Sequence, residues 1–193
     1  RDQIHLLLLE NVQVKKHFMI DLETMGLASN AAILSIGICR FDQENIHETF
    51  YTNVSLADCL AHGLTTTPST EKWWSEQSVE ARAAWQDANA PTLTDALTKM
   101  HQWFAPLASK RELCPWGNGA DFDLVLLNSA HAALDVDPPW EFWNHHCFRT
   151  MKNMFDVGRM PRSGTYHHAL DDAITQAKHL QRILQVHNLK LTT

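Results

Sequence analysis

The chain has 193 residues, of which 45% are hydrophobic and 20% charged, and its formal net charge is −6. This length predicts about one domain with a full core. The acidic balance excludes a protein that coats nucleic acid through bulk positive charge, but it does not exclude an enzyme whose cations are bound metal ions.

No apolar run approaches the ~20 residues of a membrane span, so we expect no membrane contact. The run at residues 4–9 is too short and lacks the small-residue cleavage site of a signal peptide. We interpret residues 1–16 as an N-terminal extension and residues 17–193 as a single domain. The four cysteines are widely spaced and form no C-x-x-C motif, which predicts reduced thiols and a cytoplasmic protein.

Three strands are predicted in the first third of the chain, at residues 18–22, 31–42 and 46–54. The first is short, apolar and ended by a turn, and the second, AAILSIGICRFD, is apolar enough to be central. The connections between them are short, which favours an antiparallel meander.

Two acids follow the apolar start of the first strand, in the stretch HFMIDLETMG. Residues i and i+2 of a strand point to the same face, so Asp21 and Glu23 aim their carboxylates at one spot. The nearest cations in sequence, Lys15 and Lys16, lie at the other end of the strand. Like charges this close raise each other's pKa unless a cation such as Mg²⁺ or Mn²⁺ holds them. The alternative is a solvated strand end, where Asp-x-Glu is common.

Helices are predicted next. Thr67 and Pro68 suit an N-cap and a first helical position, and the helix that follows has a break predicted near residues 77–78. Thr92 opens a second helix. Its apolar positions recur at helical spacing: Leu93, Ala96, Leu97, Met100, Trp103, Phe104 and Leu107.

The second half alternates between strands and helices. We expect strands at residues 112–116 and 146–149, and helices at residues 122–134, 150–157 and 168–187. This order predicts an α/β fold, with a mixed sheet of five strands flanked by helices.

Further acids fall where such a sheet places functional clefts. Asp123, in WGNGADFD, opens a helix just after a strand, near the C-terminal edge of the sheet. Asp121 competes for the same role, and an acid at a helix N-terminus is also favoured by the macrodipole alone. The stretch YHHALDDA places two histidines before Asp171 and Asp172 at the start of the last helix.

The ordered set of motifs resembles the DEDDh 3′–5′ exonucleases of the RNase T and epsilon-proofreading superfamily, which have a ribonuclease H-like fold. The matching residues are Asp21, Glu23, Asp123, His167 and Asp172. More narrowly, AAILSIGICRFD, EKWWSEQSVEAR, WGNGADFD and HHALDDA resemble the small bacterial and phage branch that includes the mycobacterial 3′–5′ exoribonuclease. The ordered set is far more specific than any single motif.

The two histidines present a choice. At ~100° per residue, His168 lies about 40° from Asp172 on a helical wheel and His167 about 140° away, which favours His168. The family spacing favours His167, which is reasonable if His167 precedes the first regular turn. We follow the family spacing.

The resemblance implies a mechanism and a substrate. Two metal ions, Mg²⁺ or Mn²⁺, about 3.5–4 Å apart would bind the attacking and leaving oxygens of a phosphodiester, with Asp21, Glu23, Asp123 and Asp172 as their ligands. His167 would act as general base. The family releases nucleoside 5′-monophosphates from the 3′ end of DNA or RNA, single-stranded or with a 3′ overhang. Thr24, Met25 and Gly26 would line the terminal nucleotide, while Leu22 points into the core.

Basic and aromatic residues suggest further contacts. The segment from Arg149 to Arg162 carries four cations against one acid, so we expect Arg149 and Arg162 to contact phosphates, although a solvated surface is equally compatible. Trp73 and Trp74 could stack a base, but helical tryptophans are more often core residues. Relatives on the resembled branch suggest a homodimer. The number of tryptophans on or beside helices agrees: Trp73, Trp74, Trp85, Trp103, Trp140 and Trp143.

Two alternatives compete with a nuclease. One is a nucleic-acid-binding module with a weak or inactive site, which would be expected to lack part of the carboxylate set. The other is a zinc protein that uses His145, His146 and Cys147 with His167 or His168. Adjacent His-His-Cys is poor spacing for tetrahedral zinc, and no second cysteine pair exists.

Overall fold

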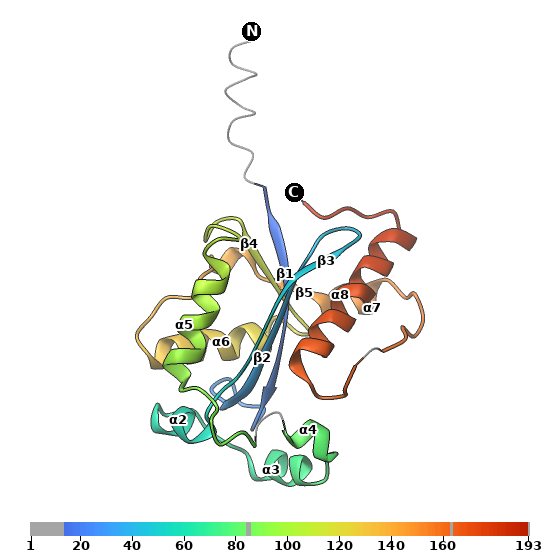
Figure 1. Cartoon of the computed structure of the whole chain (residues 1–193). Helices are drawn as coiled ribbons and strands as arrows, with labels where there is room; N and C mark the ends of the chain where they lie inside the picture. Colours follow the sequence, from blue (N-terminus) through green and yellow to red (C-terminus); the bar gives the residue numbers. More distant parts are fainter. Residues whose placement is uncertain (1–13, 84–85, 163, 193) are drawn as a thin grey trace, which may run out of the picture.

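The computed structural model describes residues 14–83, 86–162 and 164–192. A mixed sheet of five strands, in the order β3-β2-β1-β4-β5, runs through the centre of this part of the chain (Figure 1). Strands β1, β2 and β3 form the predicted antiparallel meander, and β4 and β5 extend the sheet in parallel with β1. The strands are β1 (Lys16–Thr24), β2 (Ile33–Phe41), β3 (Ile46–Asn53), β4 (Leu113–Gly117) and β5 (His146–Cys147).

Helices cover both faces of the sheet. In Figure 1, α5 and α6 lie on one side, α7 and α8 lie on the other, and α3 and α4 lie beyond one end of the strands. The α/β fold with a mixed five-stranded sheet is therefore confirmed. The helices are α2 (Leu56–Ala61), α3 (Pro68–Ser75), α4 (Val79–Ala83), α5 (Leu93–Phe104), α6 (Asp123–Ala133), the 3₁₀ turn η1 (Phe142–Asn144), α7 (Phe148–Met154) and α8 (Ala169–Val186).

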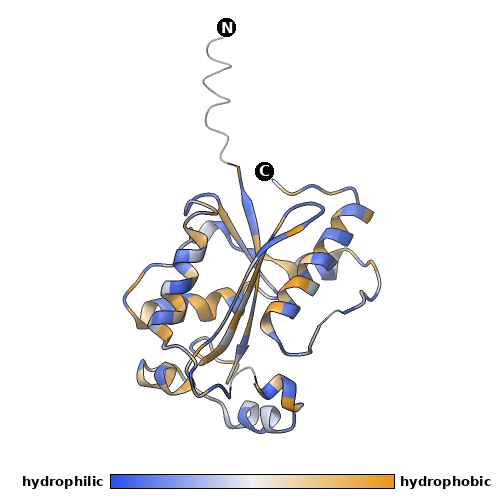
Figure 2. Ribbon diagram, viewed as in Figure 1, coloured by the Kyte–Doolittle hydropathy of each residue, from blue (hydrophilic) through white to orange (hydrophobic). Residues whose placement is uncertain are grey.

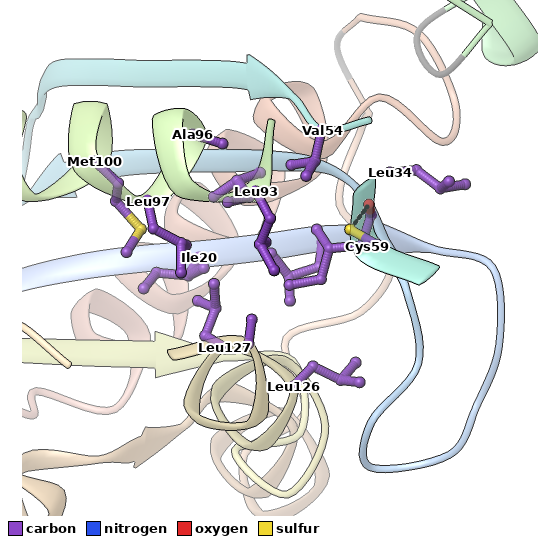
Figure 3. Packing of buried hydrophobic residues seen from close by; sticks show 14 of the residues in the cluster. Ile20, Leu34, Val54, Cys59, Leu93, Ala96, Leu97, Met100, Leu126 and Leu127 are labelled. Carbon is purple, nitrogen blue, oxygen red and sulfur yellow. Dashed lines mark hydrogen bonds between the residues drawn. The ribbon is translucent and has the colours of Figure 1, made fainter. Parts of the chain in front are cut away.

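One hydrophobic cluster fills the space between the sheet and helices α5 and α6. Figure 3 shows Leu93, Leu97 and Met100 of α5 close to Ile20 of β1 and Leu127 of α6. The helical spacing predicted for α5 is confirmed, because its apolar residues are buried against the sheet. Burying large aliphatic side chains of this kind contributes about 1.5–3 kcal/mol each relative to leaving them exposed.

A second cluster lies on the opposite face, under α8. Met19 of β1 and Cys39 of β2 pack there against Ala173, Ala177 and Leu180. Figure 2 shows hydrophobic and hydrophilic residues mixed along α8, and all but one of its buried residues are apolar. Alternate residues of a strand share a face, so the face that carries Met19 also carries the two acids that follow it on β1.

Several element boundaries differ from those expected. The strand predicted at residues 146–149 has only two residues, because Phe148 already begins α7 and is buried. Helix α2 and the turn η1 were not predicted, and both are too short to show a period. The break predicted near residues 77–78 is confirmed by the separation of α3 from α4. Residues 1–13 of the predicted extension lie outside the described residues, and Lys16 is already part of β1.

The cysteines are in the reduced state that the sequence predicts. All four cysteines are free thiols, and three of them are buried. Among the residues that the structure describes, none of the helices combines the length and hydrophobicity needed to cross a bilayer.

Gly37 in β2 determines how closely α8 approaches the sheet. A Cβ atom built at Gly37 would lie 2.2 Å from the carbonyl carbon of Ala169 and 2.2 Å from the amide nitrogen of Leu170. The backbone of the first turn of α8 therefore rests directly on this strand. Gly37 is also paired with Asp21 across the ladder, so the same contact brings the start of α8 next to the first acid of β1.

We predict that Gly37→Ala destabilises the protein by about 3 kcal/mol, the upper part of the range for overpacking, because the clash is with backbone atoms that cannot rotate away. Chemical denaturation measures the change. Thr49→Ala on exposed β3 is the control and should change stability by less than about 0.5 kcal/mol. Equal stability of the two variants would show that α8 can move away from β2 at no cost.

Candidate active site

The two acids of β1 lie together at its C-terminal end, on the face covered by α8. Asp21 pairs with Gly37 and Glu23 pairs with Ser35 on the neighbouring strand. Glu23 is buried, with 8% of its surface exposed. Leu22, between them, points to the opposite face and belongs to the core beneath α5 and α6, as the strand period requires.

Asp123 joins them from the neighbouring strand. Strand β4 ends at Gly117, and the turn that follows delivers Asp123 as the first residue of α6. Its side chain is buried, its Oδ2 lies 3.0 Å from the position that a Cβ of Gly117 would occupy, and the backbone N–H groups of Leu22 and Asn118 act to lower its pKa. Asp121, the competing acid, is exposed. Of the two acids, Asp123 is the one that reaches the end of β1.

The start of α8 completes the cluster. One ligand atom from each of Glu23, His167 and Asp172 lies within 4.8 Å of the others. His167 has a left-handed backbone, with φ of 60°, and precedes the first residue of α8. The helical wheel therefore does not apply to His167. The family spacing was reasonable only if His167 precedes the first regular turn, and it does.

His168 has a different environment. It is the N-cap of α8, and its Nδ1 accepts a weak hydrogen bond of 3.4 Å from the N–H of Asp171. Its ring stacks on Tyr51, with centroids 4.4 Å apart. These contacts hold the N-terminus of α8 against β3, with the ring of His168 turned toward Tyr51.

Gln176 is a member of the site that the sequence reasoning missed. Its Nε2 donates a 2.6 Å hydrogen bond to Oδ1 of Asp21, and its Oε1 is buried without a partner in the described structure. Gln176 lies one turn after Asp172 on the buried strip of α8. A polar residue within an apolar strip, four positions from an acid of the site, was the available signal.

Burial and mutual repulsion shift the ionisation of these groups. Burial raises the pKa of Glu23 to about 8 and that of Asp123 to about 7. Burial, with the charges of Asp123 and Glu23, raises the pKa of Asp21 well above its usual range. Burial and the charge of Arg162 lower the pKa of His167. A neutral imidazole therefore stands beside carboxyl groups that ionise reluctantly.

Arg162, which the sequence analysis expects to contact phosphates, lies among the carboxylates. Its guanidinium forms an ion pair with Asp172, stacks 4.0 Å over the ring of Tyr166 and donates to the carbonyl oxygen of Thr165 at 3.1 Å. Its charge also lowers the pKa values of Asp21 and Glu23, against the larger effect of burial. The expectation that nothing basic accompanies the two acids is wrong for the folded chain, because a loop distant in sequence returns to them.

Arg149 lies at the edge of the same site. Its Nη2 donates a 2.6 Å hydrogen bond to the carbonyl oxygen of Asn118, in the turn that leads to Asp123. The Oδ1 atom of Asn118 is buried without a partner in the described structure. Both arginines of the basic segment thus lie close to the carboxylates, one among them and one beside the turn.

A cavity of about 410 Å³ opens next to Glu23. Of the three residues expected to line a bound nucleotide, Thr24 lies on its wall. Met25 is 2% exposed and belongs to the core, and Gly26 packs against Thr67, so both lie behind the wall. The complete lining is Leu22, Glu23, Thr24, Leu27, Ser69, Thr70, Trp73, Trp74 and Phe122.

The two tryptophans of α3 have different roles in this cavity. Trp74 is buried, and its Nε1 donates a 2.9 Å hydrogen bond to the carbonyl oxygen of Thr24. Trp73 is 39% exposed, and its ring lies 4.8 Å from that of His167. Trp73 therefore offers the accessible aromatic surface beside the carboxylates, and Trp74 supports the wall.

The donor set fits hard divalent cations. Mg²⁺ and Mn²⁺ bind carboxylate oxygens, and four carboxyl groups from β1, α6 and α8 meet here at the C-terminal edge of the sheet. The site also holds a buried atom without a hydrogen-bond partner in the described structure, Oε1 of Gln176. In the part of the chain that the structure describes, Glu23, His167 and Asp172 are the one group of three or more such ligands close enough to share an ion.

Residues 16–184 match the family of 3'-5' exoribonuclease Rv2179c-like domains. The chain belongs to this family. It is accordingly an enzyme of the 3′–5′ exonuclease class. A curated relative of this exonuclease is the "Exodeoxyribonuclease" of Enterobacteria phage T4, which is 29% identical, with 69% of each chain covered.

Solved structures share the fold of the exonuclease. The nuclease domain of 3'hExo, a DEDDh family member bound to rAMP, superposes with a TM-score of 0.62 at 16% identity and covers 93% of this chain and 96% of its own. E. coli exonuclease I in complex with single-stranded DNA gives a TM-score of 0.65 at 14% identity over 91% of this chain. The exonuclease spans only 42% of that larger chain. The ribonuclease H-like architecture expected from the motifs is thus confirmed.

We predict that the exonuclease loses stability in chelator as pH rises from 5 to 8. The pKa values of Asp21, Glu23 and Asp123 are raised in the folded protein. The contribution of these groups to the free energy of unfolding is therefore fully present below the unfolded pKa of about 4, and it is lost as pH rises through the folded values. Melting temperatures across this range, with and without Mg²⁺ or Mn²⁺, measure the loss, which the metal should reduce.

Asp21→Asn separates this effect from general pH sensitivity. It removes one charge but keeps an acceptor for Gln176, so its melting temperature in chelator at pH 8 should exceed that of the unaltered protein. A lower melting temperature would show that the carboxylate of Asp21 stabilises the fold.

Proposed function

We propose that this exonuclease hydrolyses phosphodiester bonds from the 3′ end of single-stranded DNA or RNA, or of 3′ overhangs, and releases nucleoside 5′-monophosphates. The observation that carries the proposal is the convergence of Glu23, His167 and Asp172 on one point, next to Asp21 and Asp123. Carboxylates this close together repel one another, and bound cations would relieve the repulsion and hold the phosphate of the substrate.

The proposed cofactor is a pair of divalent ions, Mg²⁺ or Mn²⁺. Asp21, Glu23, Asp123 and Asp172 would hold them, and DEDDh exonucleases as a group use divalent metals. When bound, two such ions stabilise negative charge on the attacking and leaving oxygens of an in-line displacement. Gln176 holds the carboxylate of Asp21 in place through its 2.6 Å hydrogen bond.

We assign the general base to His167. Burial and the charge of Arg162 lower its pKa, so its imidazole is neutral at pH 7 and can accept a proton from the attacking water. It is positioned between Trp73, whose ring lies 4.8 Å away, and the carboxylates of Glu23 and Asp172. An ordinary histidine becomes protonated below a pH of about 6.5, and a protonated imidazole cannot act as a base. Because the pKa of His167 is lowered, we expect activity to fall only at a more acidic pH.

The substrate strand would be held on both sides of this point. The apolar cavity beside Glu23, with Thr24 and the exposed ring of Trp73 on its wall, suits the terminal nucleotide. Met25 and Gly26 would support that wall from behind. Arg162 and Arg149 would contact phosphates, and Arg162 would exchange its ion pair with Asp172 for the phosphate when the cations bind.

We propose that the enzyme accepts both ribose and deoxyribose, and so cleaves both RNA and DNA. The family is described by an exoribonuclease activity, whereas the phage T4 relative is called an exodeoxyribonuclease. Among the structural neighbours, one is bound to rAMP and another to single-stranded DNA.

Two other proposals concern the context of the enzyme. We propose that residues 17–193 act as one exonuclease domain in the cytosol, where four free thiols remain reduced. The homodimer stays a prediction. Of the tryptophans on which it rests, Trp73 and Trp143 are exposed, Trp74 and Trp140 are buried, and Trp85 lies outside the described residues.

The alternatives have less support. A binding module without activity would be expected to lack a carboxylate, yet all four are present and gathered at one edge. The zinc interpretation required His145, His146 and Cys147 to share an ion with a histidine of the last helix. The described residues bring no such group together, and the ring of His146 instead stacks on Trp116 at 4.5 Å.

The test is digestion of matched 5′-labelled DNA and RNA oligonucleotides, single-stranded and with 3′ overhangs. We expect no product in EDTA, a ladder shortened from the 3′ end when Mg²⁺ or Mn²⁺ is added, and nucleoside 5′-monophosphates as products. Full activity in chelator would contradict the proposal, and so would products cut internally.

The same assay separates the histidines. His167→Ala should lower kcat by about 10²–10⁴-fold, as expected for a general base. His168→Ala is the matched control. It removes an N-cap, so it should lower stability by about 1 kcal/mol while leaving most of the activity. If His168→Ala is the inactive variant, the role assigned to His167 is wrong.

A further inference from the structure

A hollow lies away from the carboxylates, beside the second half of α8. It has a volume of about 990 Å³ and runs between α8, the turn that joins β2 to β3, and the C-terminal tail. Its cations are Lys178 and Arg182 on α8 and Lys190 in the tail, and its one acid is Glu44. We refer to it as the α8 groove.

The cations of the α8 groove are available to a ligand. Within the described residues, none of Lys178, Arg182 and Lys190 forms an ion pair with a carboxylate, and Arg182 donates only to the side chain of Gln185. Lys178 and Arg182 are four residues apart, which places them on one side of the helix. A protein with a formal charge of −6 thus keeps a row of unneutralised positive charge on one surface.

The groove lies further along α8 than the active site. Between Arg149 and Lys190 the sequence holds seven lysines and arginines against three aspartates. Lys178 and Arg182 follow Asp172 by about 9 Å and 15 Å along the helix axis, from a rise of 1.5 Å per residue. Met160, on the loop that carries Arg162, also lines the groove. The loop that carries Arg162 therefore borders the groove, and the cations of the groove lie on the second half of α8 and in the tail.

We propose that the α8 groove binds the phosphates of the substrate strand on the 5′ side of the nucleotides that are being cleaved. This rests on the proposed function and adds an occupant to a surface that the chemistry does not use. Regularly spaced phosphates match a row of lysine and arginine side chains. The residues that line the groove include no aromatic side chain, so the contacts follow the backbone, tolerate any base sequence and weaken with salt.

The proposal implies that the substrate must be long enough to reach the groove. We compare a dinucleotide, which occupies only the cleavage site, with a 12-mer in the variant Lys178→Ala/Arg182→Ala. For the 12-mer, KM at low salt should rise by roughly fivefold or more. The slope of log KM against log salt should fall by about 1.4, since each phosphate contact on a single strand contributes about 0.7. The values of kcat for both substrates and KM for the dinucleotide should not change.

The matched control removes the same charge elsewhere. Lys99 on α5 and Arg111 before β4 are exposed, and Lys99→Ala/Arg111→Ala should leave KM and its salt dependence unchanged for both substrates. If the control raises KM for the 12-mer as much as the groove variant does, the effect is general and the proposal is overturned. It is also overturned if the groove variant equals the unaltered enzyme.

The dinucleotide keeps this test separate from the proposed function. Hydrolysis of the dinucleotide reports on the carboxylates alone. Failure of the unaltered enzyme to cleave either substrate would contradict the proposed function and, with it, the occupant proposed here. Cleavage of both, with equal KM values for the groove variant and the unaltered enzyme, would remove the groove proposal alone.

Discussion

The contact between the backbone of α8 and Gly37 of β2 is the constraint on which the site depends. Because β2 offers no side chain at that position, the first turn of α8 rests on the strand next to Asp21. Three groups of the site depend on that turn. His167 lies just before it, Asp172 lies on it, and Gln176 lies one turn later. Any side chain at position 37 would push all three away from the acids of β1, so a single missing Cβ links the core beneath α8 to the chemistry at its end.

The same closeness makes the site electrostatically unfavourable without cations. Burial raises the pKa values of Glu23 and Asp123 to about 8 and 7, and Asp21 is shifted in the same direction. Arg162 offsets part of this repulsion through its ion pair with Asp172. The guanidinium therefore stands near where metal ions would act, and a divalent cation with two charges competes with it more effectively than a monovalent one. The proposed metal binding requires these carboxylates to be ionised, whereas the stability of the metal-free fold favours their protonated forms. Strongly shifted pKa values of this kind are typical of functional sites.

The fold was largely predictable, and the site only partly so. The alternation of strands and the apolar spacing of α5 follow from local periodicity, and the facing of Asp21 and Glu23 follows from the strand period. The ion pair of Arg162 with Asp172 and the contact of Gln176 with Asp21 were out of reach, because the partners come from distant segments. Met25 and Gly26 follow Glu23 by two and three positions, yet the chain turns back into the core there. The end of β5 was misplaced because Phe148 suits a strand as well as the buried start of α7.

Soaking or co-crystallising the protein with Mn²⁺ and a nucleoside 5′-monophosphate, and locating manganese by anomalous scattering, tests the central claim most directly. The account predicts two manganese ions bound by Asp21, Glu23, Asp123 and Asp172, with Arg162 released from Asp172 toward the phosphate. The account would be contradicted by the absence of manganese from these carboxylates, with Arg162 still paired to Asp172 and the nucleotide bound elsewhere.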